Sequence, residues 1–179
     1  LYVAINLSAT DFHSARLISQ ISEKAQSHAV CINQIKIEVT ERGFIDVQKT
    51  TPVIQAFREA GYEVAIDDFG TGYSSLSHLS SLNVDILKID KSFIDTLTTH
   101  GTSHTIAEHI IEMARSLHLK TVAEGVETLD QVKWLQKRGV RYCQGWHFAR
   151  AMPVQEFKQW LVKAPALLNA CAQTRQAEI

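Results

Sequence analysis

The sequence predicts an α/β protein whose parallel strands form a (β/α)8 barrel. Strand-like segments alternate with helix-like segments six times, with a period of about 30 residues, as in strands joined by right-handed helical crossovers. Each strand also has polar or ionisable residues at its carboxyl end: Asn6, Glu38, Asp67 with Asp68, Lys88 with Asp90, Glu124 and Gln144. A closed barrel gathers all these ends around one mouth, whereas an open doubly wound sheet, which the periodicity alone also allows, spreads them along a line. We therefore favour the barrel.

The strands are identified by short runs of β-branched and other apolar residues that end in polar ones. They are expected at residues 2–7, 35–41, 64–69, 84–90, 120–125 and 141–145. A barrel contains eight strands in about 250 residues, so two strand–helix units are missing from this chain. Because the chain opens on Leu1, directly at a strand, we expect it to be part of a longer polypeptide.

The helices are identified by apolar residues at helical spacing and by capping residues. They are expected at about 10–28, 52–61 and 73–81, around Ile106, Ile110, Met113 and Leu117, at 128–139, and at about 153–161. The expected helix starts are Ser8 with Asp11, Thr51 followed by Pro52 at the first helical position, and a Thr128–Gln131 capping box; the expected stops are Gly61 and Gly139. We expect one domain over residues 1–162 and an Ala-rich tail over 163–179.

The composition excludes several classes of protein. Of the 179 residues, 45% are hydrophobic and 21% are charged, which is typical of one folded domain and not of a disordered chain. The formal net charge of −1 argues against binding of DNA or RNA through the phosphate backbone. Cys31, Cys143 and Cys171 are widely spaced and indicate a reducing compartment, with neither a zinc site nor a disulfide framework. The sequence shows no membrane-spanning run and no signal-peptide pattern.

The strand ends carry the donor set of a divalent-cation site. Asp67 and Asp68 follow a buried strand directly, where two ionised carboxylates need a cationic partner. Glu38, Glu124 and the amide of Asn6 add further oxygen donors at neighbouring strand ends. Such hard oxygens suit Mg²⁺ or Mn²⁺ and suit zinc or copper poorly. Two ions about 3.5–4 Å apart could bridge a phosphodiester and activate a water molecule.

Several of these residues also have a purely structural interpretation. Asp90 and Glu127 are placed where the N-cap of a following helix is expected. Lys88 could form a salt bridge with Asp67 in a site without metals. Asp67 and Asp68 fit such an interpretation less well, because two adjacent acids cannot both cap a helix. We expect them to point to opposite faces of their strand.

Taken together, these segments resemble the successive motifs of the bacterial EAL domain family. The matching segments are Ile5-Asn6-Leu7-Ser8, Glu38-Val39-Thr40-Glu41, Asp67-Asp68-Phe69-Gly70-Thr71-Gly72-Tyr73-Ser74-Ser75-Leu76, Leu87-Lys88-Ile89-Asp90, Ala123-Glu124-Gly125-Val126-Glu127, and Gln144-Gly145 with Met152-Pro153. The Glu-Ala-Leu tripeptide that names the family, and the arginine shortly after it, are not in this chain and are expected upstream. The resemblance implies a modified TIM-type barrel with one metal ligand and one substrate-binding side chain outside these residues.

The resemblance also implies which residues hold the metals. Asn6, Glu38 and Asp67 would hold one ion together with the absent glutamate. Asp67 would bridge to a second ion, which Asp68 and Glu124 would also bind. Glu124 is in addition the candidate general base.

Other residues are implied to bind or support the reacting groups. Lys88 is expected to bind the nucleophilic water or a phosphate oxygen, and Gln144 to orient that water. Asp90 is expected to orient Lys88 or metal-bound waters. Glu41 is expected to anchor the loop after the paired aspartates, and Glu127 to support the site. That loop is expected to contact the substrate through Asp68, Gly70, Thr71 and Gly72.

The activity that the resemblance implies is hydrolysis of one phosphodiester of cyclic di-GMP to linear pGpG. It would require two Mg²⁺ or Mn²⁺ ions and be inhibited by Ca²⁺. The implied setting is a cytoplasmic domain of a bacterial protein that forms a homodimer and carries sensor or receiver domains, and in some cases a membrane anchor, elsewhere in its chain. Because the first strands are lacking, we expect these 179 residues alone to be inactive.

Two other functions fit parts of the sequence. A degenerate domain of the same family would bind cyclic di-GMP, or a protein partner, without turnover. A dinucleotide-binding oxidoreductase is suggested by Gly70-Thr71-Gly72-Tyr73-Ser74-Ser75 after a strand, with Asp90 twenty residues later. The third glycine of that fingerprint is replaced by Ser75, and the paired aspartates would repel a pyrophosphate.

Overall fold

The computed structural model describes residues 2–8, 10–11, 14, 16–41, 47–71, 79, 82–97 and 102–173. The chain divides into two compact units, Leu1–Phe148 and Ala149–Ile179. The first unit contains the sheet and every strand-end residue discussed above. The second contains one helix, α7 (Val154–Gln173).

The sheet of the first unit has six strands in the order of the sequence, β1-β2-β3-β4-β5-β6, and all neighbouring pairs are parallel. The strands are β1 (Val3–Leu7), β2 (Ile35–Thr40), β3 (Glu63–Phe69), β4 (Ile86–Ile89), β5 (Lys120–Ala123) and β6 (Tyr142–Cys143). This order confirms the predicted α/β class with parallel strands. It also rules out the doubly wound alternative, because such a sheet reverses its strand order at a switch point.

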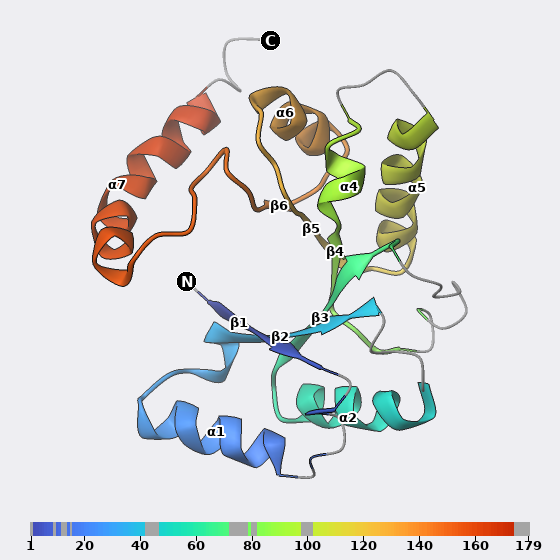
Figure 1. The fold of residues 1–179 in the computed structure, drawn as a ribbon, viewed down its shortest axis with the longest axis vertical. Helices are drawn as coiled ribbons and strands as arrows, with labels where there is room; N and C mark the ends of the chain where they lie inside the picture. Colours follow the sequence, from blue (N-terminus) through green and yellow to red (C-terminus); the bar gives the residue numbers. More distant parts are fainter. Residues whose placement is uncertain are drawn as a thin grey trace. The chain divides into compact units, whose positions relative to one another are not determined.

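Helices connect the strands and lie along the sheet in Figure 1, with α1 and α2 beside β1–β3 and α4, α5 and α6 beside β4–β6. Their bounds are α1 (Leu17–Ser27), the 3₁₀ turn η2 (Ile32–Gln34), α2 (Val47–Glu59), α4 (Lys91–Ile94), α5 (Thr102–Ser116) and α6 (Leu129–Lys137). The helix expected at 73–81 falls almost entirely outside the described residues. Among the described helices, none combines the length and the apolar character that a membrane span requires.

Two helix starts differ from the prediction. Ser8 and Asp11 form only half of the expected capping pair: the Ser8 amide donates to Asp11 Oδ2 at 2.7 Å, but the Asp11 amide donates to the Ser8 carbonyl at 3.0 Å and not to the Ser8 hydroxyl. Helix α1 begins only at Leu17, because an isolated turn satisfies the same pair as well as a helix does. Similarly, α2 begins at Val47, so Pro52 lies inside the helix and not at its first position.

Burial explains the longer α2. Thr50, Ile54 and Phe57 are each at most 2% exposed, and their spacing puts them on one face of the helix. The buried face therefore starts two residues before Pro52, whose missing N–H costs the helix one hydrogen bond.

At the far end of the chain, α7 continues to Gln173 instead of stopping near residue 161. Alanine has the highest helix propensity, which accounts for a helix through this Ala-rich stretch. The predicted boundary between a domain at 1–162 and a tail at 163–179 stays a prediction.

The two faces of the sheet have different characters because side chains alternate along each strand. One face packs against the helices, and its central side chains are at most 1% exposed: Ile37, Val39, Val64, Ile66, Leu87 and Ile89. The other face carries a small apolar cluster of Ala65, Ile86 and Val122. It also carries the charged residues, so charge accumulates on this second face, which in a barrel is the inner one.

At the amino-terminal end of this inner face, Glu63 forms ion pairs with both Lys36 and Lys120. The ammonium of Lys36 also lies 4.3 Å from the centre of the Tyr2 ring. Hydrogen bonds from Lys120 and Lys36 hold the pKa of the Glu63 carboxyl below its ordinary value. The carboxylate thereby links β3 to β2 and β5.

We expect Glu63→Gln to destabilise the protein by about 0.5–1 kcal/mol at pH 7, the range for a partly exposed ion pair. A depressed carboxyl pKa contributes stability above the pKa of the unfolded chain, and this contribution disappears as the pH falls through the folded-state pKa. The difference between variant and parent should therefore shrink at pH 3. Urea unfolding at both pH values measures it, with the exposed Glu23→Gln as control. An equal loss at both pH values would contradict the assignment.

Candidate active site

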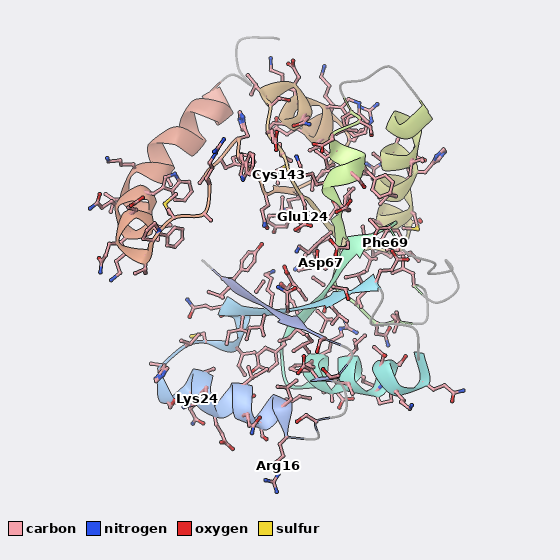
Figure 2. The ribbon with its side chains drawn as sticks, in the orientation of Figure 1. Arg16, Lys24, Asp67, Phe69, Glu124 and Cys143 are labelled. Atoms are coloured by element: carbon pink, nitrogen blue, oxygen red, sulfur yellow. The ribbon has the colours of Figure 1, made fainter. Side chains whose placement is uncertain are left out.

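The carboxylates that the sequence places at strand ends meet on the inner face of the sheet. Asp67 lies near the carboxyl end of β3, opposite Thr40 of β2, and Glu38 lies two residues before Thr40, so both acids belong to the same face. Glu124 follows β5 directly. Figure 2 shows Asp67 and Glu124 directed into the same region from these two strands. The alternation of side chains along the strands thus accounts for their meeting.

Lys88 of β4 lies at the centre of this group and is only 4% exposed. Its Nζ is 2.9 Å from Glu38 Oε2, 2.8 Å from Asp67 Oδ1 and 2.8 Å from Glu124 Oε1. Burial disfavours the ammonium, but its hydrogen bonds to the three carboxylates outweigh this and raise the pKa of Lys88 above its ordinary value. Lys88 therefore stays protonated and offsets part of the negative charge.

Glu124 lies in the same partly buried group of charges as Lys88. Burial raises the pKa of its carboxyl above the ordinary value, and the neighbouring carboxylates Asp67 and Glu38 add to this effect, while Lys88 opposes it. A carboxylate of raised pKa accepts a proton more readily than an exposed one does.

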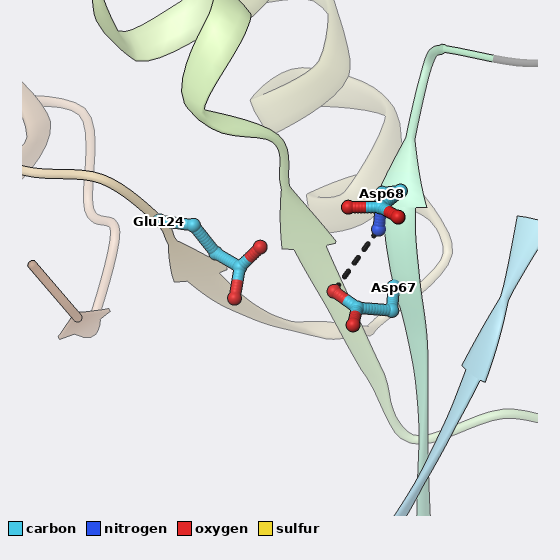
Figure 3. A group of neighbouring side chains, drawn as sticks. All are labelled: Asp67, Asp68 and Glu124. Atoms are coloured by element: carbon cyan, nitrogen blue, oxygen red, sulfur yellow. Dashed lines mark hydrogen bonds between the residues drawn. The ribbon is translucent and has the colours of Figure 1, made fainter. Parts of the chain in front are cut away.

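Asp67, Asp68 and Glu124 form a compact oxygen cluster. One carboxylate oxygen from each lies within 4.8 Å of the others (Figure 3). The expectation that Asp67 and Asp68 point to opposite faces is therefore wrong. The pairing of β3 with β4 shifts register between Ile66 and Phe69, and Asp68 has a φ of 53°, so the strand no longer alternates there.

The backbone at Asp68 is stabilised locally. Its amide donates a 3.0 Å hydrogen bond to Asp67 Oδ1. Aspartate is one of the few residues other than glycine that tolerate a left-handed backbone, because its short side chain can hydrogen-bond nearby. The turn thus brings the second carboxylate to the same side as the first.

The donor types in this cluster fit a hard divalent cation. Carboxylate oxygens are the ligands that Mg²⁺ and Mn²⁺ prefer. Three carboxylates contact the ammonium of Lys88, and the carboxylate of Asp68 lies beside two of them, so the group has more acidic side chains than basic ones. Among the residues that the structure describes, the cluster of Asp67, Asp68 and Glu124 is the one group of three acids, histidines or cysteines that could hold an ion.

The loop after the paired aspartates is held by Glu41, which is 5% exposed. Its Oε2 accepts a 2.9 Å hydrogen bond from the amide of Gly70. Thr71 Oγ1 donates to the carbonyl of Asp68 at 2.9 Å, closing the turn. Gly72, the last predicted substrate-binding residue of this loop, lies outside the described residues.

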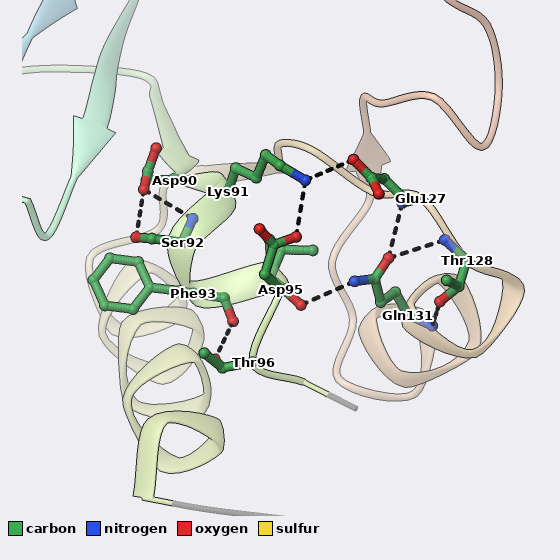
Figure 4. A network of polar contacts seen from close by, with 10 residues as sticks. Asp90, Lys91, Ser92, Phe93, Asp95, Thr96, Glu127, Thr128 and Gln131 are labelled. Atoms are coloured by element: carbon green, nitrogen blue, oxygen red, sulfur yellow. Dashed lines mark hydrogen bonds and ion pairs between the residues drawn. The ribbon is translucent and has the colours of Figure 1, made fainter. Parts of the chain in front are cut away.

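Asp90 and Glu127 take part in a network around α4 (Figure 4). Asp90 Oδ1 caps α4 by accepting from the amide of Ser92 at 2.9 Å, as the structural interpretation of Asp90 anticipates. Glu127 instead pairs with Lys91 at 2.7 Å. The N-cap of α6 is Thr128, with Gln131 completing the predicted capping box.

Asn6 and Gln144 lie at the two edges of the sheet, and both are exposed. Asn6 of β1 is the register partner of Glu38. Gln144 follows β6, and its amide donates to the carbonyl of Ala123 at 2.8 Å, next to Glu124. Both residues are thus adjacent to the acidic cluster through the backbone pairing of the strands.

Sequence reasoning missed two residues near the site. Lys91 contacts Gly125, which follows Glu124, and Phe93 contacts Gly70, two residues after Asp68. The available signal was the placement of each glycine within two residues of a strand-end carboxylate. Glycine at such a place often marks a close approach of another segment.

Comparison with known proteins gives consistent results. A model of the EAL domain family matches residues 1–151. The probable cyclic di-GMP phosphodiesterase PdeB of Escherichia coli K12 is 46% identical over 159 residues, which cover 89% of this chain and 30% of that protein. The chain thus spans less than a third of the length of this relative.

Solved structures agree with the sequence comparison. The structure of the PaMucR phosphodiesterase in complex with c-di-GMP has a TM-score of 0.81 and 36% identity, covering 87% of this chain and 64% of that one. BlrP1 of Klebsiella pneumoniae in a manganese and c-di-GMP complex has a TM-score of 0.76 and 35% identity, covering 83% and 38%. A calcium and c-di-GMP complex of BlrP1 has a TM-score of 0.77.

We expect Lys88→Met to lower the free energy of unfolding by about 3 kcal/mol without divalent cations, because three partly buried carboxylates lose their shared ammonium. Mg²⁺ should restore part of this loss by supplying positive charge. Urea unfolding with and without Mg²⁺ measures both effects, with the exposed Lys133→Met as matched control. Unchanged stability of Lys88→Met without cations would contradict this description of the cluster.

Proposed function

This chain belongs to the EAL domain family, and we propose that the protein that carries it hydrolyses one phosphodiester of cyclic di-GMP to linear pGpG. The observation that carries the proposal is the cluster of Glu38, Asp67 and Glu124 around Lys88, with Asp68 brought to the same side. The six parallel strands correspond to part of the TIM-like barrel of this family, and in such a barrel a cluster at the carboxyl ends of the strands would lie at the mouth.

The oxygen donors of the site would hold two divalent cations, Mg²⁺ or Mn²⁺. We assign Asn6, Glu38 and Asp67 to one ion, and Asp67, Asp68 and Glu124 to the other. Bound there, such ions would polarise a phosphodiester and lower the pKa of water.

The residues of the chain supply the remaining groups. Glu124 would accept the proton of the attacking water as the water oxygen bonds to phosphorus and the P–O bond to the leaving ribose oxygen breaks, and that oxygen would take up a proton from solvent. Lys88 carries a permanent ammonium that would bind a phosphate oxygen or orient the water. Gln144, beside Glu124 at the edge of the sheet, would orient the same water through its amide.

The turn after β3 would contact the substrate. Asp68, Gly70 and Thr71 belong to this turn, and we assign Gly72, the next residue in the sequence, to the same role. Glu41 fixes its backbone by accepting from the Gly70 amide, so we assign Glu41 to positioning the turn. Asp90 and Glu127, through the network around α4, would support the adjoining strand ends.

We further propose that the protein acts in the bacterial cytoplasm as a homodimer under the control of sensor or receiver domains in the same chain. The length of the relatives supports the presence of further domains, since the chain spans 30% of PdeB. The family resemblance is the basis for the dimer and the location.

The structure argues against the dinucleotide-binding oxidoreductase but does not separate the enzyme from a binding module without turnover. The dinucleotide-binding fold conflicts with the strand order, and Asp90 caps α4 where a ribose ligand would be required. A domain that binds cyclic di-GMP without turnover shares the same acidic cluster, so it is distinguished from the enzyme by activity alone.

We expect Asp67→Asn in the whole protein to reduce hydrolysis by at least about a thousandfold, because Asp67 is assigned to both ions and contacts Lys88. Formation of pGpG, followed by chromatography, measures the rate. Asp130→Asn, at an exposed position in the first turn of α6, is the control and should retain parental activity. Near-normal turnover by Asp67→Asn would refute the two-metal assignment, and absence of turnover in a parent that binds cyclic di-GMP would favour the binding module.

Replacing Mg²⁺ by Ca²⁺ should preserve binding of cyclic di-GMP and abolish hydrolysis. Ca²⁺ accepts the same oxygen donors, but its larger and more flexible coordination positions a water molecule poorly. Calorimetric titration of cyclic di-GMP in Ca²⁺, together with the hydrolysis assay, tests both parts. Full activity in Ca²⁺ alone would be the contrary result.

A further inference from the structure

The short helix α4 lies between the two loops that carry the acidic cluster, and it touches a glycine in each. On one side is Gly70, two residues after Asp68. A Cβ at Gly70 would lie 2.7 Å from Cε2 and 2.8 Å from Cζ of Phe93, so the ring packs directly on the backbone of the turn. The Gly70 amide is meanwhile bound by Glu41. The turn is thus held between a carboxylate and an aromatic ring.

On the other side is Gly125, which follows Glu124 directly. A Cβ at Gly125 would lie 2.6 Å from both Cβ and Cδ of Lys91, so the aliphatic part of Lys91 covers this backbone. The ammonium of Lys91 then reaches Glu127 at 2.7 Å and Asp95 at 2.9 Å. Lys91 therefore contacts the loop after β5 both through its stem and through its charge.

The helix that carries these two side chains is itself anchored at both ends (Figure 4). Its amino terminus is capped by Asp90. At its carboxyl end the carbonyl of Ile94 accepts a buried 3.1 Å hydrogen bond from Gln131 Nε2, and Ile94 is fully buried. A helix of four residues has little stability of its own, so these anchors determine its position.

We infer that α4 is a spacer that sets the separation of Asp68 and Glu124, with Phe93 and Lys91 as the positioning residues. The inference rests on the proposed function, because it concerns the same cluster. Each glycine allows contact without an intervening side chain, so a displacement of α4 moves both loops. A metal site tolerates only small errors in the placement of its ligands, and residues that orient ligands typically change metal affinity by 10–100-fold.

The spacer predicts coupling between the loops that is measurable without metal. In the metal-free whole protein, Phe93→Ala and Lys91→Ala should each accelerate amide hydrogen exchange about tenfold in both segments, 68–71 and 124–127. Lys133→Ala, an exposed lysine on the neighbouring α6, should leave both segments unchanged. Acceleration confined to the segment that the mutated side chain touches would overturn the inference.

Binding of Mn²⁺, followed by calorimetry, provides the second readout. Phe93→Ala and Lys91→Ala should weaken Mn²⁺ binding at least tenfold, and Lys91→Met, which keeps the stem over Gly125, should weaken it less than Lys91→Ala. Parental affinity in all three variants would also overturn the inference. If the parent protein binds Mn²⁺ but does not hydrolyse cyclic di-GMP, the proposed function fails while the exchange and binding results still decide the role of α4.

Discussion

The contact of Lys88 with three carboxylates is the interaction on which the inner face of the sheet depends. Glu38, Asp67 and Glu124 come from three different strand ends, and each lies within 2.9 Å of the same ammonium. Without that charge their mutual repulsion in a partly buried setting would be unfavourable. The ammonium thus fixes the strand ends relative to one another. A cation entering the site would meet carboxylates that already have partners, so its binding is an exchange of ion pairs.

The same face shows the reverse arrangement at its opposite end. There a single carboxylate, Glu63, lies between the ammonium groups of Lys36 and Lys120. Among the described residues, the buried apolar side chains of this face form the small cluster of Ala65, Ile86 and Val122 between the two charged groups. The helix-covered face supplies the main hydrophobic core, which leaves the inner face available for chemistry.

Much of the fold could be predicted because strands and caps are local patterns. The polar residue at the end of each strand, the capping box of Thr128 and Gln131, and the stops at Gly61 and Gly139 all depend on neighbours in the sequence. The start of α2 was misplaced because burial of Thr50 outweighed the preference of Pro52 for the first helical position. The contacts of Phe93 with Gly70 and of Lys91 with Gly125 join residues far apart in the chain, and no local pattern encodes them.

The backbone at Asp68 restricts how this position can change during evolution. Its φ of 53° favours glycine, asparagine or aspartate, and under the proposed metal assignment this position would in addition need a side-chain oxygen. Glycine meets only the first condition and glutamate only the second, whereas asparagine meets both but without the negative charge. A homologue with glycine or glutamate at this position is therefore expected to have changed its turn, its chemistry or both.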